Sequence, residues 1–457
     1  MNIRPHFVAL SISVAVGLIA PVYANPKASP TQVAQPASVN LSQLIEIAIS
    51  SDPSRKQFYT QAQAIRETGI ASATQMDPKL RVGVTGLPVD SFKFDQDPMT
   101  NISVGLMQQF ERGNTAQLKG KKANSQAKGV ELQVAARELD VINSMTELWL
   151  ELGYLQVARE ILLESRLLMV EMENFINTNY SIGKSDTQDL LNAQIQVTKL
   201  DEKLQANSQM QQRTIGRFAE WLGPDLLNNH QPVQASNQLN WSKLQQQLTT
   251  SSGTEQYFAL LSHYPMVKMA DINIATNQIQ EDIAEQAYTP QFGVEVMYGY
   301  RQSKGMNGQP ASDLVSAYLT LDLPLFTGNR QDRNLSAAQH QVVASRSQKD
   351  ALIRQLIGRV SGLLVERDNL TERLERYQTA LLPQAKARVN AVERGYQSNT
   401  AQFSELISAS SDVLALKLEH QRLLTDLNLV NNNLAALLGG YDYQAPEPQV
   451  VTDLTQD

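Results

Sequence analysis

The chain of 457 residues contains no cysteine. It therefore offers no disulfide, no thiolate nucleophile and no Cys-ligated metal site. Beyond the first 24 residues it has no run of about 18 apolar residues, so no transmembrane helix is expected there. Its 39 basic and 46 acidic residues are spread along the chain, and no basic run indicates a nucleic-acid partner. Neither a G-x-S-x-G nor an H-E-x-x-H motif occurs, and we expect neither an enzyme nor a cofactor.

The first segment has the pattern of a secretory signal. Arg4 precedes the apolar run FVALSISVAVGLIA, and Ala24 supplies a small residue at the expected cleavage point. A run of about 14 apolar residues is shorter than the roughly 20 that span a bilayer, which argues against an uncleaved anchor. We therefore expect 1–24 to be removed, 25–40 to be a flexible lead-in rich in Pro, Ser and Ala, and the protein to function outside the cytosol.

The most informative feature that is present is an internal repeat. Landmarks recur in the same order at nearly constant spacing: Pro53 and Pro265 (265 − 53 = 212), Pro78 and Pro290 (290 − 78 = 212), and Tyr180 and Tyr396 (396 − 180 = 216). This pattern predicts two similar halves that pack as one body. We place them at 41–223 and 253–439, joined by an equatorial linker at 224–252 and followed by a tail at 440–457.

Each half contains a segment that reads as an unusually long helix. Residues 115 to about 178 lack proline and carry apolar residues at helical spacing. About 64 residues at 1.5 Å each make a rod of about 95 Å. Asn114 is the predicted N-cap of this rod, with Gln117 completing a capping box.

The second rod is predicted over 332–397, capped by Asn329 and kinked or broken at Pro383. Returning helices are predicted over 187–221 and 402–437. They carry one apolar stripe each, so they need neighbours of their own kind. Helices alone are equally compatible with a soluble coiled coil.

Four segments alternate between apolar and polar residues, as strands with two different faces do. They are LRVGVTGL (80–87), ISVGLMQQF (102–110), FGVEVMYGY (292–300) and VSAYLTLDLPLF (315–326). Their length is that of tilted membrane-spanning strands. A half-buried sheet in a soluble domain has the same pattern. Four strands cannot close a membrane barrel, so strands that face lipid require several chains to share one barrel.

These segments together resemble the TolC-type outer-membrane efflux protein family over nearly the whole chain after the signal. The resemblance is carried by the paired starts SDP and HYP, by DPKL and TPQF, by QQFERGN and LPLFTGN, by NYSIGKSDTQDLLNAQ and GYQSNTAQFSELISAS, and by AALLGG. The segment LPVDSFKFDQDPMTNISVGLMQQFERGN resembles the heavy-metal branch, which serves resistance-nodulation-division pumps.

The resemblance implies an α+β membrane protein, a homotrimer whose chains give four strands each to a 12-stranded outer-membrane β-barrel. Long helices would continue the barrel into the periplasm. Such a protein is a passive exit duct for metal ions or small toxic compounds. Its partners would be outer-membrane lipid, a periplasmic adaptor and an inner-membrane resistance-nodulation-division pump.

The resemblance also implies where the periplasmic entrance lies. In the family a pore-facing carboxylate follows the Gly of a Gly-Tyr pair by ten positions, which selects Glu405 after Gly395. The repeat selects Asp189 in the other half (405 − 216 = 189), and Tyr180 and Tyr396 mark the two entrance turns. The alternative for both acids is a solvated position near a helix N-terminus, where acids are mildly favoured.

Two other classes of protein, a hydrolase and a soluble adaptor, share parts of this pattern. A hydrolase would need an acid–base pair, for which Glu295 and Asp322 on neighbouring predicted strands are the candidates. Polar residues that face a channel explain both acids more simply. A soluble periplasmic coiled-coil adaptor would share the rods but has no use for strands with a lipid-facing side. No metal site is predicted, because the 12 methionines form no cluster.

Overall fold

The structure is a computed structural model that describes residues 40–223, 233–250, 254–305, 308–398 and 400–441. The predicted signal, nearly all of the lead-in, parts of the linker and most of the tail lie outside the described residues.

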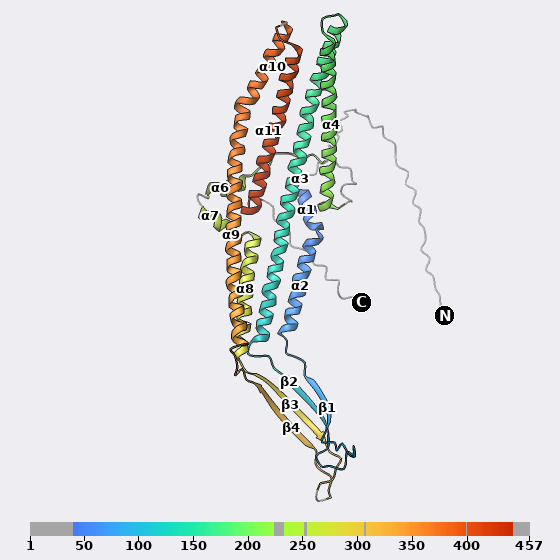
Figure 1. Cartoon of the computed structure of the whole chain (residues 1–457), viewed down its shortest axis with the longest axis vertical. Coiled ribbons are helices and arrows are strands. Elements are labelled where there is room, and N and C mark those ends of the chain that lie inside the picture. The colour runs from blue at the N-terminus through green and yellow to red at the C-terminus, as the bar shows by residue number, and fades with distance from the viewer. Residues whose placement is uncertain (1–39, 224–232, 251–253, 306–307, 399, 442–457) are drawn as a thin grey trace, which may run out of the picture. The chain divides into compact units, whose positions relative to one another are not determined.

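The two halves have the same order of elements (Figure 1). The first half consists of α1 (Leu41–Ser51), α2 (Pro53–Ala73), β1 (Lys79–Thr85), β2 (Asn101–Gln109), α3 (Thr115–Ser181) and α4 (Thr187–Leu222). The second consists of α7 (Thr254–Leu261), α8 (Pro265–Glu285), η1 (Gln286–Tyr288), β3 (Gln291–Tyr300), β4 (Leu314–Asp322), α9 (Gln331–Arg376), η2 (Tyr377–Leu381), α10 (Leu382–Gln397) and α11 (Phe403–Leu438). The short helix α6 (Ser242–Thr250) lies in the predicted linker.

The repeat register is confirmed where helix gives way to strand. Pro78 directly precedes β1 and Pro290 directly precedes β3, so both lie at equivalent switches. Proline has a fixed φ and no N–H, which suits a position where a helical pattern stops and a strand begins.

The second rod contains one residue more than the first, and the structure shows where this residue is inserted. Asn114 and Asn329 precede the two rods at a spacing of 215 (329 − 114), whereas Tyr180 and Tyr396 end them at 216 (396 − 180). Between these points α9 passes into the π-helical turn η2, directly before Pro383. A single inserted residue is the usual origin of such a turn. The predicted break at Pro383 is therefore a π-helical turn within a continuing helix.

Both predicted caps of the rods are wrong. The side chain of Asn114 makes no capping bond; its backbone N–H donates instead to Oε1 of Gln286, at 3.1 Å. The second rod begins after Arg330 rather than after Asn329. By contrast, Asn40 and Gln43 form a complete capping box at α1, with bonds of 2.9 and 3.2 Å.

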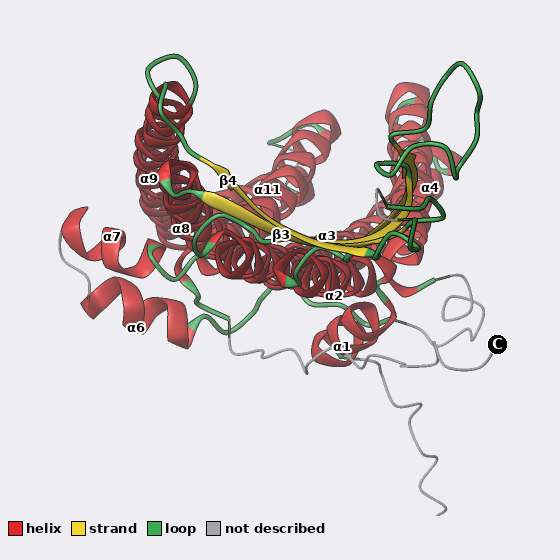
Figure 2. Cartoon of the chain, turned by 90° about the horizontal axis from the view of Figure 1, so that it is seen from below, coloured by secondary structure: helices red, strands yellow, loops and turns green. Residues whose placement is uncertain are grey.

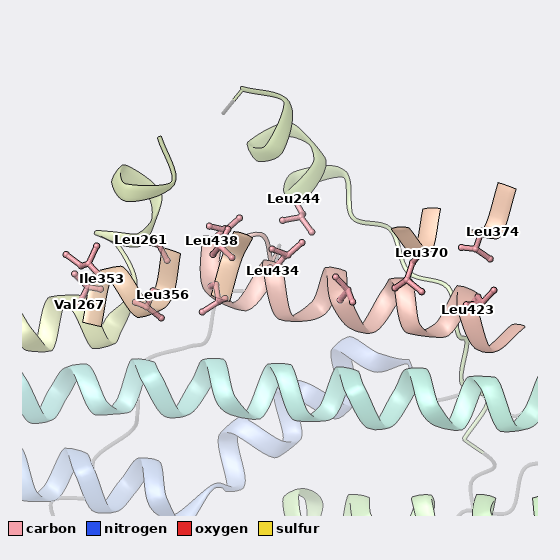
Figure 3. Packing of buried hydrophobic residues seen from close by; sticks show 14 residues of the cluster. Leu244, Leu261, Val267, Ile353, Leu356, Leu370, Leu374, Leu423, Leu434 and Leu438 are labelled. Carbon is pink, nitrogen blue, oxygen red and sulfur yellow. The ribbon is translucent and has the colours of Figure 1, made fainter. Parts of the chain in front are cut away.

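The helices pack side by side in the order α2, α3, α8 and α9, with α4 and α11 also against α3. The core of the second half joins α9 and α11 to the short helices, and Leu244, Leu261 and Val267 are buried in it (Figure 3). The core of the first half joins α1 to α3 and α4. Tyr441 packs against both cores, and its hydroxyl hydrogen-bonds Oδ1 of Asn432 at 2.7 Å. Burial raises the pKa of that hydroxyl well above its usual range.

The strands form one antiparallel sheet in the order β1-β2-β3-β4, curved in cross-section (Figure 2). β1 and β4 are its two edges, and neither has a partner on its outer side among the described residues. In the part of the chain that the structure describes, no helix combines the length and the apolarity needed to cross a membrane.

Candidate functional site

One face of the sheet is apolar and faces solvent in the single chain. Leu80 on β1 is 69% exposed and Leu319 on β4 is 67% exposed. The other residues of this face are exposed as well: Val82, Val84, Ile102, Val104, Leu106, Phe292, Val294, Val296, Tyr298, Tyr300, Val315 and Leu321. A continuous apolar surface of this kind marks a contact with lipid or protein.

The opposite face carries paired charges. Arg81 on β1 reaches across Gly105 of β2 to Glu295 on β3, with Nη1 3.1 Å from Oε1. Glu295 is only 8% exposed, so the guanidinium offsets the cost of burying its carboxylate. Arg112 pairs with Asp322, the last residue of β4. Because each acid has its own arginine, Glu295 and Asp322 do not form the acid–base pair that a hydrolase would need.

The second candidate site lies at the two helical turns. After α3, Gly183 adopts a φ of +75°, and the N–H of Lys184 donates to the carbonyl of Asn179 at 2.8 Å. Glycine takes this left-handed conformation without the cost that other residues meet. After α10, the N–H of Thr400 donates to the carbonyl of Gly395 at 2.7 Å. A Cβ on Gly395 would lie 3.0 Å from Cβ of Ala401, so this turn needs glycine for close approach.

Asp189 and Glu405 occupy matching positions in the first turns of α4 and α11. Their surroundings differ. Glu405 is exposed, whereas Asp189 is half-buried. Partial burial, and next the neighbouring charge of Asp186, raise the pKa of the Asp189 carboxyl above its ordinary value. The repeat therefore supplies two acids at matching helix starts in different surroundings.

Tyr180 and Tyr396 also match in position and differ in environment. The Tyr396 ring lies between Phe175 and Phe403, with centroids 6.4 and 5.8 Å away. Tyr180 is exposed. The first half has Thr187 where the second has Phe403 (403 − 216 = 187), so the aromatic contact has no counterpart there.

An apolar cluster, here called the tip cluster, joins the two turns. It consists of the buried Ile176, Ala193, Phe403 and Ile407, with Met172, Leu190 and Tyr396 packed against them. A groove of about 520 Å³ opens beside it between the two helical hairpins. Its walls combine apolar residues such as Met169 and Phe175 with Lys199, Lys203 and Lys417. The sequence analysis missed this groove, although the spacing of Met169, Met172 and Phe175 is that of one helix face.

Residues 257–440 match the family model described as "Outer membrane efflux protein". This match covers 184 of the 457 residues (440 − 257 + 1), nearly the whole second half of the chain. It agrees with the resemblance to outer-membrane efflux proteins seen in the sequence. This family is one of channel proteins and not of enzymes. No curated protein sequence matches the chain.

Several solved structures of membrane proteins share the fold of this chain. A membrane protein from Pseudomonas aeruginosa is 15% identical, with a TM-score of 0.72 over 92% of this chain and 96% of that one. CusC is 15% identical, with a TM-score of 0.71 over 92% and 99%. VceC from Vibrio cholerae is 18% identical, with a TM-score of 0.67 over 87% and 94%. A soluble adaptor does not account for this fold.

Proposed function

We propose that three copies of this chain form an exit duct in the outer membrane, with the helical part in the periplasm, and that the duct conducts small toxic compounds or metal ions passively to the exterior. The observation that carries the proposal is the sheet. One of its faces is apolar and exposed, the other is polar, and both edge strands are open. Open edges cannot lie in hydrocarbon, because their unpaired N–H and C=O groups would lose hydrogen bonds to water. Three chains of four strands give the 12 strands that close a barrel around a polar channel.

The proposal is tested by purifying the protein in detergent and reconstituting it in planar bilayers. We expect a particle of three chains, each with the full-length mass of 50.7 kDa less that of the removed signal, and ohmic single-channel currents. A stable monomer, or a trimer that carries no current under any voltage, would overturn the duct.

We further propose that the groove between the hairpins receives a helical hairpin of a periplasmic adaptor, which links the duct to an inner-membrane resistance-nodulation-division pump. The combination of exposed apolar side chains and lysines suits an amphipathic helix with acidic flanks. Leu168 lies in this groove and is exposed. Leu168→Arg should lower export by living cells and leave the single-channel current intact. Export at the unaltered rate would remove the groove from the docking surface.

The proposed entrance is the ring of Asp189 and Glu405, with Tyr180 and Tyr396 at the turns. It is supported by the matching positions of the acids at the ends of the two hairpins. Six carboxylates around one axis would attract cations into the mouth of the duct and repel anions.

A further inference from the structure

The internal repeat relates every contact between the two halves of one chain to a possible contact between two chains. The hairpin β1–β2 pairs Leu80 with Leu106, and the hairpin β3–β4 pairs Phe292 with Leu321. The first strands thus correspond at a spacing of 212 (292 − 80) and the second strands at 215 (321 − 106), and this relation holds along both ladders. The two hairpins are therefore equivalent residue by residue.

We propose that this repeat fixes the contact between neighbouring copies, here called the seam: β4 and α9 of one copy against β1, α2 and α4 of the next. The inference rests on the proposed trimer and adds the residue register. Within the chain, β2 and α3 of the first half contact β3, α8 and α11 of the second. If successive halves are joined alike around the ring, the same contacts recur with β4 and α9 in place of β2 and α3.

The strand register follows directly. The β2–β3 ladder pairs Gly105 with Met297. The equivalent residues are Thr320 on β4 and Thr85 on β1 of the next copy. This register also places Leu323 and Leu325, which follow the end of β4, opposite Val82 and Leu80 of the next copy.

This register explains the alternating residues beyond Asp322. In the single chain the N–H of Leu325 donates to the carbonyl of Leu323, at 2.9 Å, and both side chains are exposed. Phe110, the counterpart of Leu325 (325 − 215 = 110), donates its N–H across the β2–β3 ladder to the carbonyl of Phe292, at 3.0 Å. In an antiparallel ladder the residues of one strand donate to the neighbouring strand at every second position. The N–H of the residue between Leu323 and Leu325 would therefore point away from β1 of the next copy. Pro324 occupies that position, and its missing N–H costs the seam no hydrogen bond.

The helices give independent support. Asn432 on α11 donates from Nδ2 to the carbonyl of Asn143 on α3, at 2.9 Å. The equivalent residues are Gly216 on α4 and Gly358 on α9. Both are exposed, and a Cβ on either would meet nothing within 4 Å in the single chain. Two glycines in helix interiors cost about 1 kcal/mol each relative to alanine, which is expected where two helix backbones approach closely.

A second helix contact agrees. The hydroxyls of Ser125 on α3 and Thr276 on α8 lie 2.8 Å apart. Their equivalents are His340 on α9 and Ala64 on α2, and both are exposed in the single chain. Residues that are buried or paired between the halves thus correspond to residues that are exposed at the two outer sides.

The first test is disulfide formation between introduced cysteines. The chain has no cysteine of its own that could form competing disulfides. The pair Thr85→Cys with Thr320→Cys should form covalent dimers and trimers on oxidation. In this register the two residues form a non-hydrogen-bonded antiparallel pair, whose Cα atoms lie about 4.5 Å apart, within disulfide range. The pair Gly83→Cys with Thr320→Cys is two residues out of register, about 7 Å along the strand, and should not cross-link. Cross-linking of the second pair in place of the first would overturn the register while leaving the trimer in place.

The second test concerns the glycines. Gly358→Leu and Gly216→Leu each fit the single chain but fill the seam, so each should abolish the trimer while circular dichroism retains its helical signal. Gly362→Leu is the matched control: it lies one turn further along α9, has the same empty surroundings, and corresponds to the exposed Glu147 on α3. Trimers in all three variants would overturn the helical part of the seam. Loss of the trimer in the unaltered protein would instead overturn the proposed duct.

Discussion

The ring of Tyr396 meets the ring of Phe175 edge-on, with centroids 6.4 Å apart and planes inclined by 72°. Phe175 belongs to α3 and Tyr396 to α10, so this contact ties one helical hairpin to the other close to the proposed entrance. The matching Tyr180 has no such contact and is exposed. The two turns at the proposed entrance are therefore equivalent by sequence position but differ in the aromatic contacts that hold them.

Tyr396→Ala should loosen the second turn. Losing two aromatic contacts should weaken the local structure by about 1–3 kcal/mol, since each is worth about 0.5–1.5 kcal/mol. The measurement is hydrogen exchange of the amides at 395–402, which should become faster. Tyr180→Ala is the matched control and should change exchange at its own turn by less than about 0.5 kcal/mol, as exposed substitutions do. Equal effects at both turns would contradict the asymmetry.

The sequence predicted the helices and strands because their patterns are local. Apolar periodicity located α3 and α11 to within a few residues, and alternation located all four strands. What failed depends on residues distant in sequence. The side chain of Gln286, 172 positions away, accepts the N–H of Asn114 that a capping box would give to Gln117, and Asn114 (φ −96°, ψ 18°) lacks the extended backbone of a capping residue. The strand predicted to continue to residue 326 ends at Asp322, where a single chain offers no partner.

At the candidate site, too, positions along the chain were predictable from the sequence, whereas contacts between distant residues were not. The family resemblance selected Glu405 and the repeat spacing then selected Asp189, and both lie in the first turns of their helices. It could not predict that Asp189 is half-buried beside Asp186, or that Phe403 and Ile176 meet in the tip cluster. These contacts join separate hairpins, and a repeat describes each half without stating how the halves differ.

Removing the acids should change the selectivity of the duct. Glu405→Ala combined with Asp189→Ala in every subunit should lower cation selectivity in planar bilayers and relieve block by multivalent cations. The effect should shrink at high salt, because the Debye length falls from about 8 Å at physiological ionic strength to about 3 Å at 1 M. Glu202→Ala, an exposed acid further along α4, is the control and should leave selectivity unchanged. Unaltered selectivity in the double variant would assign the entrance chemistry to other residues.

The raised pKa of Asp189 predicts a dependence of stability on pH. Folding raises this pKa, so the folded state binds the proton more tightly than the unfolded state does. The contribution of Asp189 to stability is therefore favourable at acid pH and lost as pH rises through the folded pKa. Asp189→Asn should melt at a higher temperature than the unaltered protein at pH 7, with the difference vanishing in acid. A lower melting temperature at pH 7 would show that the helix N-terminus stabilises the charge more than burial disfavours it.

The two faces of β4 should respond oppositely to a new charge. Leu319 lies on the apolar face and Thr320, its neighbour in the chain, on the polar one. Leu319→Lys would place an ammonium in the bilayer and should cost about 2–4 kcal/mol near the midplane, whereas Thr320→Lys keeps it in the water of the channel. We expect Leu319→Lys to lower the yield of folded protein in lipid vesicles and to shift its urea midpoint downward. Thr320→Lys should fold like the unaltered protein and reduce only the cation current, because the added charge lies on the conduction path. If both variants fold equally well, the apolar face does not lie in lipid, and the proposed barrel is contradicted.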